Sequence, residues 1–241
     1  MPKRIFYTLL IYAGSHQTIA QTPATDSNVQ KDSSDLINVY YQSLGEQSPL
    51  YNGSEYIEYA FTIQEGHPFF ASGTYINGDI NFDGMVFHNV PILYDIVKDL
   101  VVVQHFQKVY KINLVPEKID WFTLSGHTFV RLTYDSADQI KTGFYDQLYN
   151  GKTALFARRE KKILEENVNL QVYRTISSRN FYYIRKEKVY YPIRSLHTLL
   201  DVLKTQKKAI LQNLKKSKIK FRKNPEQAML MAVEYYDQLR N

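Results

Sequence analysis

The chain has 241 residues and a formal net charge of +6 at pH 7, and 44% of its residues are hydrophobic, which is ordinary for a protein that buries a core. Its length allows one large β-rich domain or two small ones. The chain contains no cysteine, which excludes disulfides and thiolate chemistry. The 20 tyrosines favour strands, because the ring packs on a half-buried sheet surface while the hydroxyl reaches a polar partner or water.

Residues 1–20 have the pattern of a cleaved secretory signal peptide. Lys3 and Arg4 form a short basic region, and an apolar stretch follows over residues 5–13. Thr18-Ile19-Ala20 is a small-x-small cleavage site. The apolar stretch is too short to span a bilayer, and no later run approaches the ~18 residues that a membrane helix needs. We therefore expect an exported protein, periplasmic or associated with the outer envelope, with no transmembrane segment in the mature chain.

Three segments are predicted before the main part of the sheet. Residues 21–34 are polar and lack periodic apolar positions, which indicates a mobile leader after cleavage. A cap at Ser34 or Asp35 and an ending near Gly45 predict a short helix. The first strand is predicted over residues 55–63, where apolar residues alternate with polar ones.

Residues 72–133 predict a meandering antiparallel sheet, because β-branched and aromatic residues alternate with polar ones along them. Asp83-Gly84 and Ser125-Gly126 have the chemistry of tight turns, and Pro91 marks a further break. The run Leu-Val-Val-Val over residues 100–103 is apolar on both faces. That run predicts a central strand that is covered on both sides.

The strand pattern resumes after a polar connection over residues 134–142. Asn150-Gly151 is the clearest hairpin signal in the chain, since both residues tolerate positive φ. The charged run 159–166 either continues the second strand of that hairpin or forms a protruding loop. A last hairpin is predicted around residues 185–188, which gives about 10–13 strands in an antiparallel β domain over residues 35–194.

Two helices are predicted in the last part of the chain, residues 195–241. Ser195 is a plausible N-cap for residues 196–217, with a break near Thr205, and Asn224-Pro225 starts a second helix that ends near residue 239. The predicted fold class is therefore α+β and mostly β. We expect a large curved antiparallel β-meander with a short N-terminal helix and with C-terminal helices packed on the same domain.

Acids and histidines are frequent in the middle of the chain, but their spacing matches no known metal or catalytic motif. We therefore predict no metal, no cofactor and no catalytic residue, and the sequence leans toward a protein that is not an enzyme. Paired carboxylates could still be assembled from Asp95, Asp99 and Asp120, which leaves a hydrolase acting on an envelope polymer as an alternative. The residues concerned are His67, Asp79, Asp83, His88, Asp95, Asp99, His105, Asp120 and His127.

The strongest electrostatic feature is a basic segment near the C-terminus. It is a candidate surface for anionic partners such as lipid headgroups, lipopolysaccharide or an acidic envelope protein. The favoured interpretation is the solvated face of two amphipathic helices, with Phe221 docking the connector between them on the core. Nucleic acid is not expected, because no stacking motif accompanies the charges. The basic residues are Lys204, Lys207, Lys208, Lys215, Lys216, Lys218, Lys220, Arg222 and Lys223.

The aromatic content supports one further hypothesis about ligands. A large curved sheet with helices over one opening can enclose a concave apolar face that holds a lipid or another hydrophobic ligand. A core filled by the protein's own side chains is the favoured interpretation of the same residues. We therefore expect a non-catalytic binding or structural component, with a carrier of a hydrophobic ligand as the first alternative.

A set of turn and cap motifs is spread over most of the mature chain. The motifs are Leu50-Tyr51-Asn52-Gly53, Gly66-His67-Pro68-Phe69-Phe70, the stretch from Phe82-Asp83-Gly84 to Asn89-Val90-Pro91-Ile92-Leu93-Tyr94-Asp95, and Phe221-Arg222-Lys223-Asn224-Pro225-Glu226 with Glu234-Tyr235-Tyr236-Asp237. In these motifs the chain resembles a group of exported Bacteroidetes-type proteins of unknown function. The resemblance implies a cell-envelope location and a β-rich body with C-terminal helices, and it implies no activity and no functional residues.

Overall fold

The computed structural model describes residues 44–45, 48–134 and 140–240. The predicted signal peptide, the predicted leader and nearly all of the predicted helix before Gly45 lie outside the described residues, so these three stay predictions. The described part begins with a single 3₁₀ turn, η2 (Pro49–Tyr51), which leads into the sheet.

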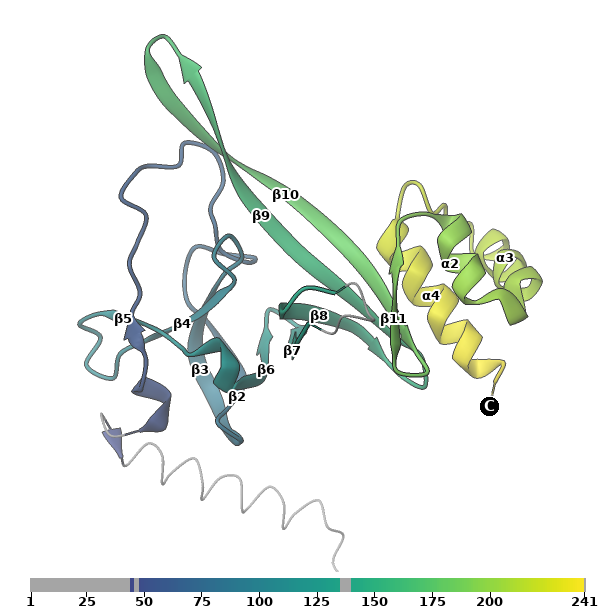
Figure 1. Ribbon diagram of the computed structural model, residues 1–241, viewed down its shortest axis with the longest axis horizontal. Coiled ribbons are helices and arrows are strands. Elements are labelled where there is room, and N and C mark those ends of the chain that lie inside the picture. The colour runs from purple at the N-terminus through teal and green to yellow at the C-terminus, as the bar shows by residue number, and fades with distance from the viewer. Residues whose placement is uncertain (1–43, 46–47, 135–139, 241) are drawn as a thin grey trace, which may run out of the picture.

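The described strands form one antiparallel sheet of eleven strands (Figure 1). The order across the sheet is β1-β5-β4-β3-β2-β6-β7-β8-β9-β10-β11. The strands are β1 (Ser54–Glu55), β2 (Ile76–Phe82), β3 (Met85–Asp95), β4 (Leu100–Gln104), β5 (Lys111–Asn113), β6 (Ile119–Leu124), β7 (His127–Leu132), β8 (Gly143–Asn150), β9 (Ala154–Val168), β10 (Gln171–Lys186) and β11 (Val189–Ile193). An antiparallel, mostly β fold with C-terminal helices is therefore confirmed.

Two of the predicted turns and the predicted covered strand are confirmed. The hairpin predicted at Asn150-Gly151 forms, but its connection is residues 151–153, because Asn150 still pairs with Ala154, and neither Asn150 nor Gly151 has positive φ. Both residues of Asp83-Gly84 and both of Ser125-Gly126 have positive φ, the backbone that a two-residue hairpin turn of the primed type requires. β4 lies between β3 and β5, and Val101, Val102 and Val103 are completely buried. The next core layer is aromatic, with the rings of Phe122 and Phe129 stacked at a centroid distance of 4.9 Å.

Two predictions in the first half of the sheet are wrong. The strand predicted over residues 55–63 is only the two-residue β1, because most of this segment pairs with no other strand. Its alternation arises from individual contacts instead: Tyr56 and Tyr59 point to the sheet, while Ile57 is 78% exposed. The break predicted at Pro91 is also absent, because β3 runs through that residue.

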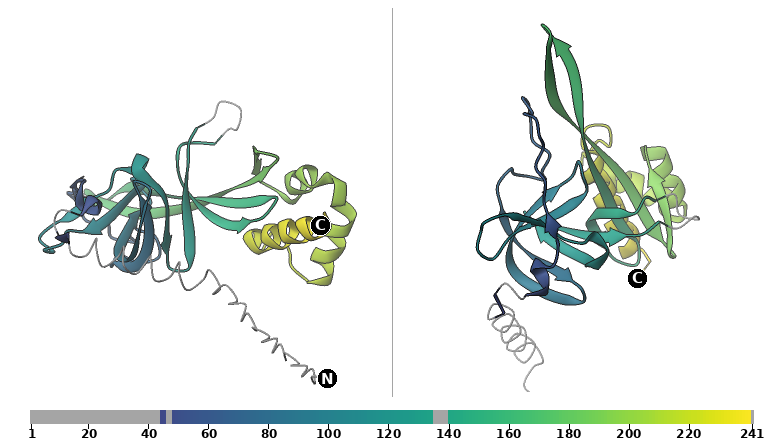
Figure 2. Two further views of the ribbon diagram at one scale, coloured as in Figure 1. Left: turned by 90° about the horizontal axis from the view of Figure 1, so that it is seen from below. Right: turned by 60° about the vertical axis from the view of Figure 1, so that its left-hand side comes forward.

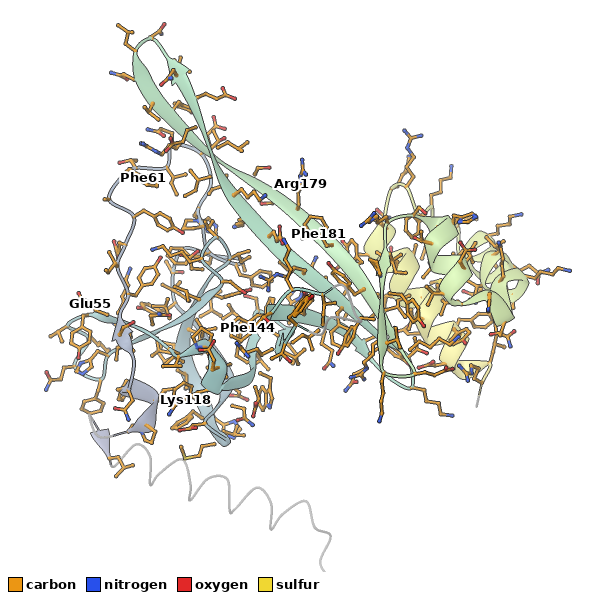
Figure 3. The ribbon with its side chains drawn as sticks, in the orientation of Figure 1. Glu55, Phe61, Lys118, Phe144, Arg179 and Phe181 are labelled. Carbon is orange, nitrogen blue, oxygen red and sulfur yellow. The ribbon has the colours of Figure 1, made fainter. Side chains whose placement is uncertain are left out.

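β9 and β10 form an arm that projects beyond the rest of the sheet, as Figure 1 and the right view of Figure 2 show. The two strands are paired over fifteen residue positions, so the charged run 159–166 continues the strand and is no loop. The segment around Glu65 supports the arm, because Ile176 donates its N–H to the Glu65 carbonyl at 3.0 Å. Phe61 also lies beside the arm, under the guanidinium of Arg174 (Figure 3).

A further 3₁₀ turn, η3 (Pro116–Lys118), leads into β6. The helices that follow β11 lie together at one end of the sheet (Figures 1 and 2). They are α2 (Leu196–Val202), η4 (Lys204–Gln206), α3 (Lys207–Lys216) and α4 (Pro225–Gln238). Ser195 caps α2 in a reciprocal capping box with Thr198, and η4 is the break expected near Thr205. The helices share one hydrophobic cluster with β9, β10 and β11, in which Leu155 and Ile184 meet Met229 and Tyr236.

Candidate binding surfaces

All nine basic residues predicted as an anionic-surface candidate are exposed. Lys204 lies in η4, four lysines lie in α3, and the other four lie in the connector between α3 and α4. The structure does not gather them into one patch. Lys215, Lys218 and Lys220 line one groove, and Lys223 lines a second cavity with Asn224 and Glu226.

The lysine-rimmed groove has a volume of about 540 Å³, within the usual range for ligand pockets. Its lining is mostly apolar. The groove lies between the start of α2, the end of α3 and the connector, and Phe221 docks there against the hydrophobic cluster of the helices. The lining residues are Leu196, Leu211, Leu214, Lys215, Lys218, Ile219, Lys220 and Phe221.

The end of α3 forms the groove through a Schellman motif. Ile219 donates its N–H to the Leu214 carbonyl at 3.3 Å, and Lys218 donates to the Lys215 carbonyl at 3.1 Å. Lys218 has a φ of +56°, in the position after the C-cap where glycine is usual. The motif turns the chain so that Ile219 packs beside Leu214 while the Lys218 side chain stays at the rim.

The tip of the arm exposes a second group of apolar side chains, which stand among polar and acidic ones. Every residue from 164 to 172 is exposed, and Leu170 is completely so. The cross-strand pairs place Leu164, Glu166 and Val168 on one face of the ribbon, since alternate residues of a strand share a face. The turn is Asn169-Leu170, and Leu170 adopts a φ of +66°, which is rare for a bulky side chain. We call residues 164–172 the arm tip.

A buried ionic network joins the base of the arm to α4. Asp146, whose side chain is 1% exposed, accepts hydrogen bonds from Arg159 Nε at 3.0 Å and Nη2 at 2.6 Å. The Nδ1 of His127 lies 2.8 Å from the same carboxylate, and it donates there because the carboxylate is an acceptor. Arg159 Nη1 also donates to Glu226 at 2.6 Å, and the Tyr182 hydroxyl donates to Glu226 at 2.9 Å.

Two opposed effects act on the acid–base properties of this network. Burial acts to raise the pKa of Glu226, but the hydrogen bonds and positive charge of Arg159 outweigh it and the pKa is lowered. Burial likewise acts to lower the pKa of Arg159, and its bonds to Glu226 and Asp146 reverse that, so the pKa is raised. Both groups therefore stay charged near neutral pH, and the network joins four neighbouring strands, β7 to β10, to α4.

A cavity of about 340 Å³ lies beside this network. His127 and Arg159 reach it, but Arg159 is already bonded to two carboxylates, and the ammonium of Lys161 donates to the backbone carbonyls of His67 and Phe69. Its lining is Phe70, Ala71, Ile96, His127, Arg159, Glu160, Lys161, Ser178 and Asn180. The cations here serve the protein's own acceptors, which makes the cavity a weaker candidate than the groove.

Three carboxylates were considered for hydrolase chemistry, and two of them, Asp95 and Asp99, accept hydrogen bonds from different donors. Asp95 is fully buried and accepts from the hydroxyls of Tyr56 at 2.8 Å and Tyr59 at 2.9 Å. Asp99 accepts from the Tyr94 hydroxyl at 2.6 Å and from Arg158 at 2.8 Å. Neither Asp95 nor Asp99 lines the groove at the end of α3 or the cavity beside the Asp146 network.

The remaining acids and histidines named from the sequence are dispersed. Asp79 pairs with His88 at 3.1 Å, Asp83 pairs with Lys118 at 2.9 Å, His105 stacks on Tyr110, Asp120 is exposed, and His67 stacks on Phe69. Over residues 44–45, 48–134 and 140–240, no three His, Asp or Glu side chains come together as a metal site would require.

Sequence reasoning missed the arm tip and the Asp146 network. One signal was available for the network: Asp146 interrupts the strand sequence Phe-Tyr-Asp-Gln-Leu-Tyr, where a lone charge among apolar residues needs a buried partner. The partner, Arg159, lay in the run whose conformation the sequence left open. For the arm tip, the signal was a bulky Leu170 where a hairpin turn favours glycine.

No protein family, curated protein or solved structure matches this chain. None of the described helices is long and apolar enough to cross a membrane. The function of the protein is therefore inferred from the groove, the arm tip and the charged side chains beside them.

Proposed function

We propose that this protein is an exported, non-catalytic binding or structural component of the cell envelope, periplasmic or associated with the outer membrane region. The observation that carries the proposal is the pair of exposed apolar surfaces at the two ends of the molecule, the arm tip and the lysine-rimmed groove (Figure 1). Contiguous apolar surface bordered by charged groups is typical of interaction sites, because leaving it in water has a free-energy cost.

The contacts of the buried acids support a non-catalytic role. Asp95, Asp99 and Asp146 each have two or more hydrogen-bond donors from tyrosine, arginine or backbone groups. A carboxylate that is saturated by its own protein is held in place and stabilises the fold, while a general acid or base must face its substrate. The hydrolase alternative finds no pair of carboxylates facing a described cavity.

The experiment is native mass spectrometry of protein purified gently from its own envelope fraction, with cell fractionation to test export. We expect a protein species heavier than the single mature chain, and we expect its amount to fall when Leu211→Asp puts a charge into the groove. Asp201→Asn, which removes an exposed charge from the neighbouring α2, is the matched control and should change nothing. The proposal is contradicted if cell fractionation places the protein in the cytoplasm. It is also contradicted if wild type and Leu211→Asp both give only the mass of the single chain.

The second candidate function is a carrier of a hydrophobic ligand, and the groove favours it. An acyl chain fits an apolar groove of about 540 Å³, and Lys215, Lys218 and Lys220 fit an anionic headgroup such as that of a lipid or lipopolysaccharide. This groove lies between helices, whereas the sequence suggested a concave face of the sheet. The carrier is supported if one acyl-chain molecule is recovered for each protein molecule and if the Lys218→Glu variant loses it.

A further inference from the structure

We propose that the arm tip of one copy of this protein binds the lysine-rimmed groove of a second copy, so that copies associate head to tail. This inference rests on the proposed binding or structural role and names its partner. It follows from the complementarity of the two surfaces, from the backbone at both of them, and from the distance between them.

The two surfaces are complementary in chemistry. The arm tip presents Leu164, Val168 and Leu170 with the carboxylate of Glu166 on the same face as Leu164 and Val168. The groove presents an apolar lining with a rim of three lysines. Apolar contact supplies affinity in such an interface, and opposite charges at its rim set orientation and speed association.

Both surfaces place a bulky residue where the backbone favours glycine. Leu170 has a φ of +66° in the arm turn, and Lys218 has a φ of +56° at the end of α3. Each side chain costs conformational free energy at its position, which glycine would avoid. Nine other described non-glycine residues also have positive φ, so the cost at Leu170 and Lys218 adds to the chemical complementarity and does not carry the inference alone.

The full solvent exposure of the arm tip is a third reason to expect a partner. Its nine residues form a two-stranded ribbon exposed on every side, and such a ribbon is only marginally stable in water on its own. The support from Glu65 and Phe61 reaches residues 173–176 and no residue of the tip itself. A surface that packs against the tip would bury its apolar side chains and fix the ribbon.

The groove that receives the tip has to belong to another molecule. β10 runs from the tip to the helical end with 16 residues, which at about 3.3 Å for each residue is roughly 50 Å. The arm points away from α2, α3 and α4 in every view (Figures 1 and 2). Since tip and groove are different surfaces, each added copy offers a fresh tip and a fresh groove, and the association builds an open chain or a closed ring.

A second copy of the chain accounts for both exposed surfaces, whereas an acyl-chain ligand in the groove accounts for only one. An acyl chain with an anionic headgroup would fill the groove and leave Leu164, Val168 and Leu170 in water. One contact between copies covers both surfaces at once, and it uses the excess positive charge near α3 against the acids of the tip. The single-copy state leaves both surfaces exposed.

Sedimentation velocity over a range of protein concentrations tests the inference. We expect the wild-type protein to form larger species as concentration rises, and added salt to weaken them. Leu170→Gly should weaken association about tenfold or more, since it removes an apolar anchor. Lys218→Gly should weaken it by about fivefold or less, since it removes one exposed rim charge. Both changes put glycine where the backbone favours it, so the variants keep their fold, which circular dichroism checks.

A charge exchange supplies the specific control. Glu166→Lys alone and Lys218→Glu alone should each weaken association, and the chain with both changes should recover it, because the opposed charges are restored with their signs reversed. A wild-type chain that stays monomeric up to its solubility limit overturns the inference, and so does association that Leu170→Gly leaves unchanged. A monomer that retains another envelope protein, or an acyl-chain molecule in its groove, overturns self-association while the binding role stands.

Discussion

Arg159 and Asp146 form a two-point contact inside the protein, with Nε at 3.0 Å and Nη2 at 2.6 Å from the same carboxylate oxygen. The third nitrogen of the guanidinium, Nη1, donates to Glu226 on α4. One side chain on β9 therefore connects the neighbouring strand β8 with the last helix. The base of the arm and the helical end are fixed relative to each other through this residue.

Replacing Arg159 by methionine should destabilise the protein by about 3–5 kcal/mol, because Asp146 would remain buried without its charge partner. The free energy of unfolding in urea measures the effect. Lys118→Met is the matched control, since it removes an ion pair to Asp83 whose two side chains are largely exposed, and such pairs contribute about 1 kcal/mol or less. Equal effects of the two changes would contradict a structural role for the Asp146 network.

The lowered pKa of Glu226 predicts how the stability of the protein depends on pH. Its pKa is lowered in the folded protein from an ordinary value of 4.5, so it contributes stability above that value and loses the contribution as pH falls through the lowered pKa. Wild type should be more stable than Glu226→Gln by a constant amount from neutral pH down to about 4.5, and the difference should shrink below it. A difference that grows in acid would show the opposite sign and refute the assignment. Thermal unfolding at a series of pH values provides the data.

Gly78 allows a close approach of two strands. A β-carbon there would collide with the backbone carbonyl of Thr123, which has no flexible end to move aside. Gly78→Ala should therefore destabilise the sheet by about 1–3 kcal/mol, the usual range for overpacking. Gly73→Ala is the control, because a β-carbon at Gly73 meets no atom within 4 Å. Urea unfolding of the two variants should give clearly different midpoints.

Leu170→Gly should stabilise the arm locally by about 1 kcal/mol, because it removes the cost of a left-handed backbone at a bulky residue. Amide hydrogen exchange along β9 and β10 measures this at protein concentrations low enough to keep the chain monomeric, since the tip can open without unfolding the whole protein. Leu170→Ala keeps the β-carbon and should give little protection. Faster exchange in the glycine variant would mean that the Leu170 side chain itself holds the tip together.

Local chemistry was enough to predict much of the fold. Asp83-Gly84 and Ser125-Gly126 specify turns by themselves, and Ser195 specifies a helix start. The prediction over residues 55–63 was wrong because alternation reports which residues face the protein but cannot supply a partner strand. Tyr56 faces inward to reach Asp95, and this gives the same pattern as a strand.

The binding surfaces were harder to predict, because they depend on contacts between distant parts of the chain. The lysines were visible in the sequence, but which three of them border a groove is decided by the turn at Lys218 and by the packing of Phe221. The arm depended on whether residues 159–166 stay paired. That pairing requires β10, and the charged composition of the run gave no sign of it.

The continuous course of β9 and β10 from the tip to the helices also has a mechanical consequence. A pull applied between Leu170 and α3 acts along the strands, while the hydrogen bonds that join β9 to β8 and β10 to β11 lie across that direction. These hydrogen bonds are loaded in shear, so they have to break at the same time and cannot break one after another from one end. In single-molecule force spectroscopy the protein should resist extension up to a high force and then unfold in one step. Arg159→Met should lower that unfolding force, because it removes a hydrogen bond that joins the arm to α4.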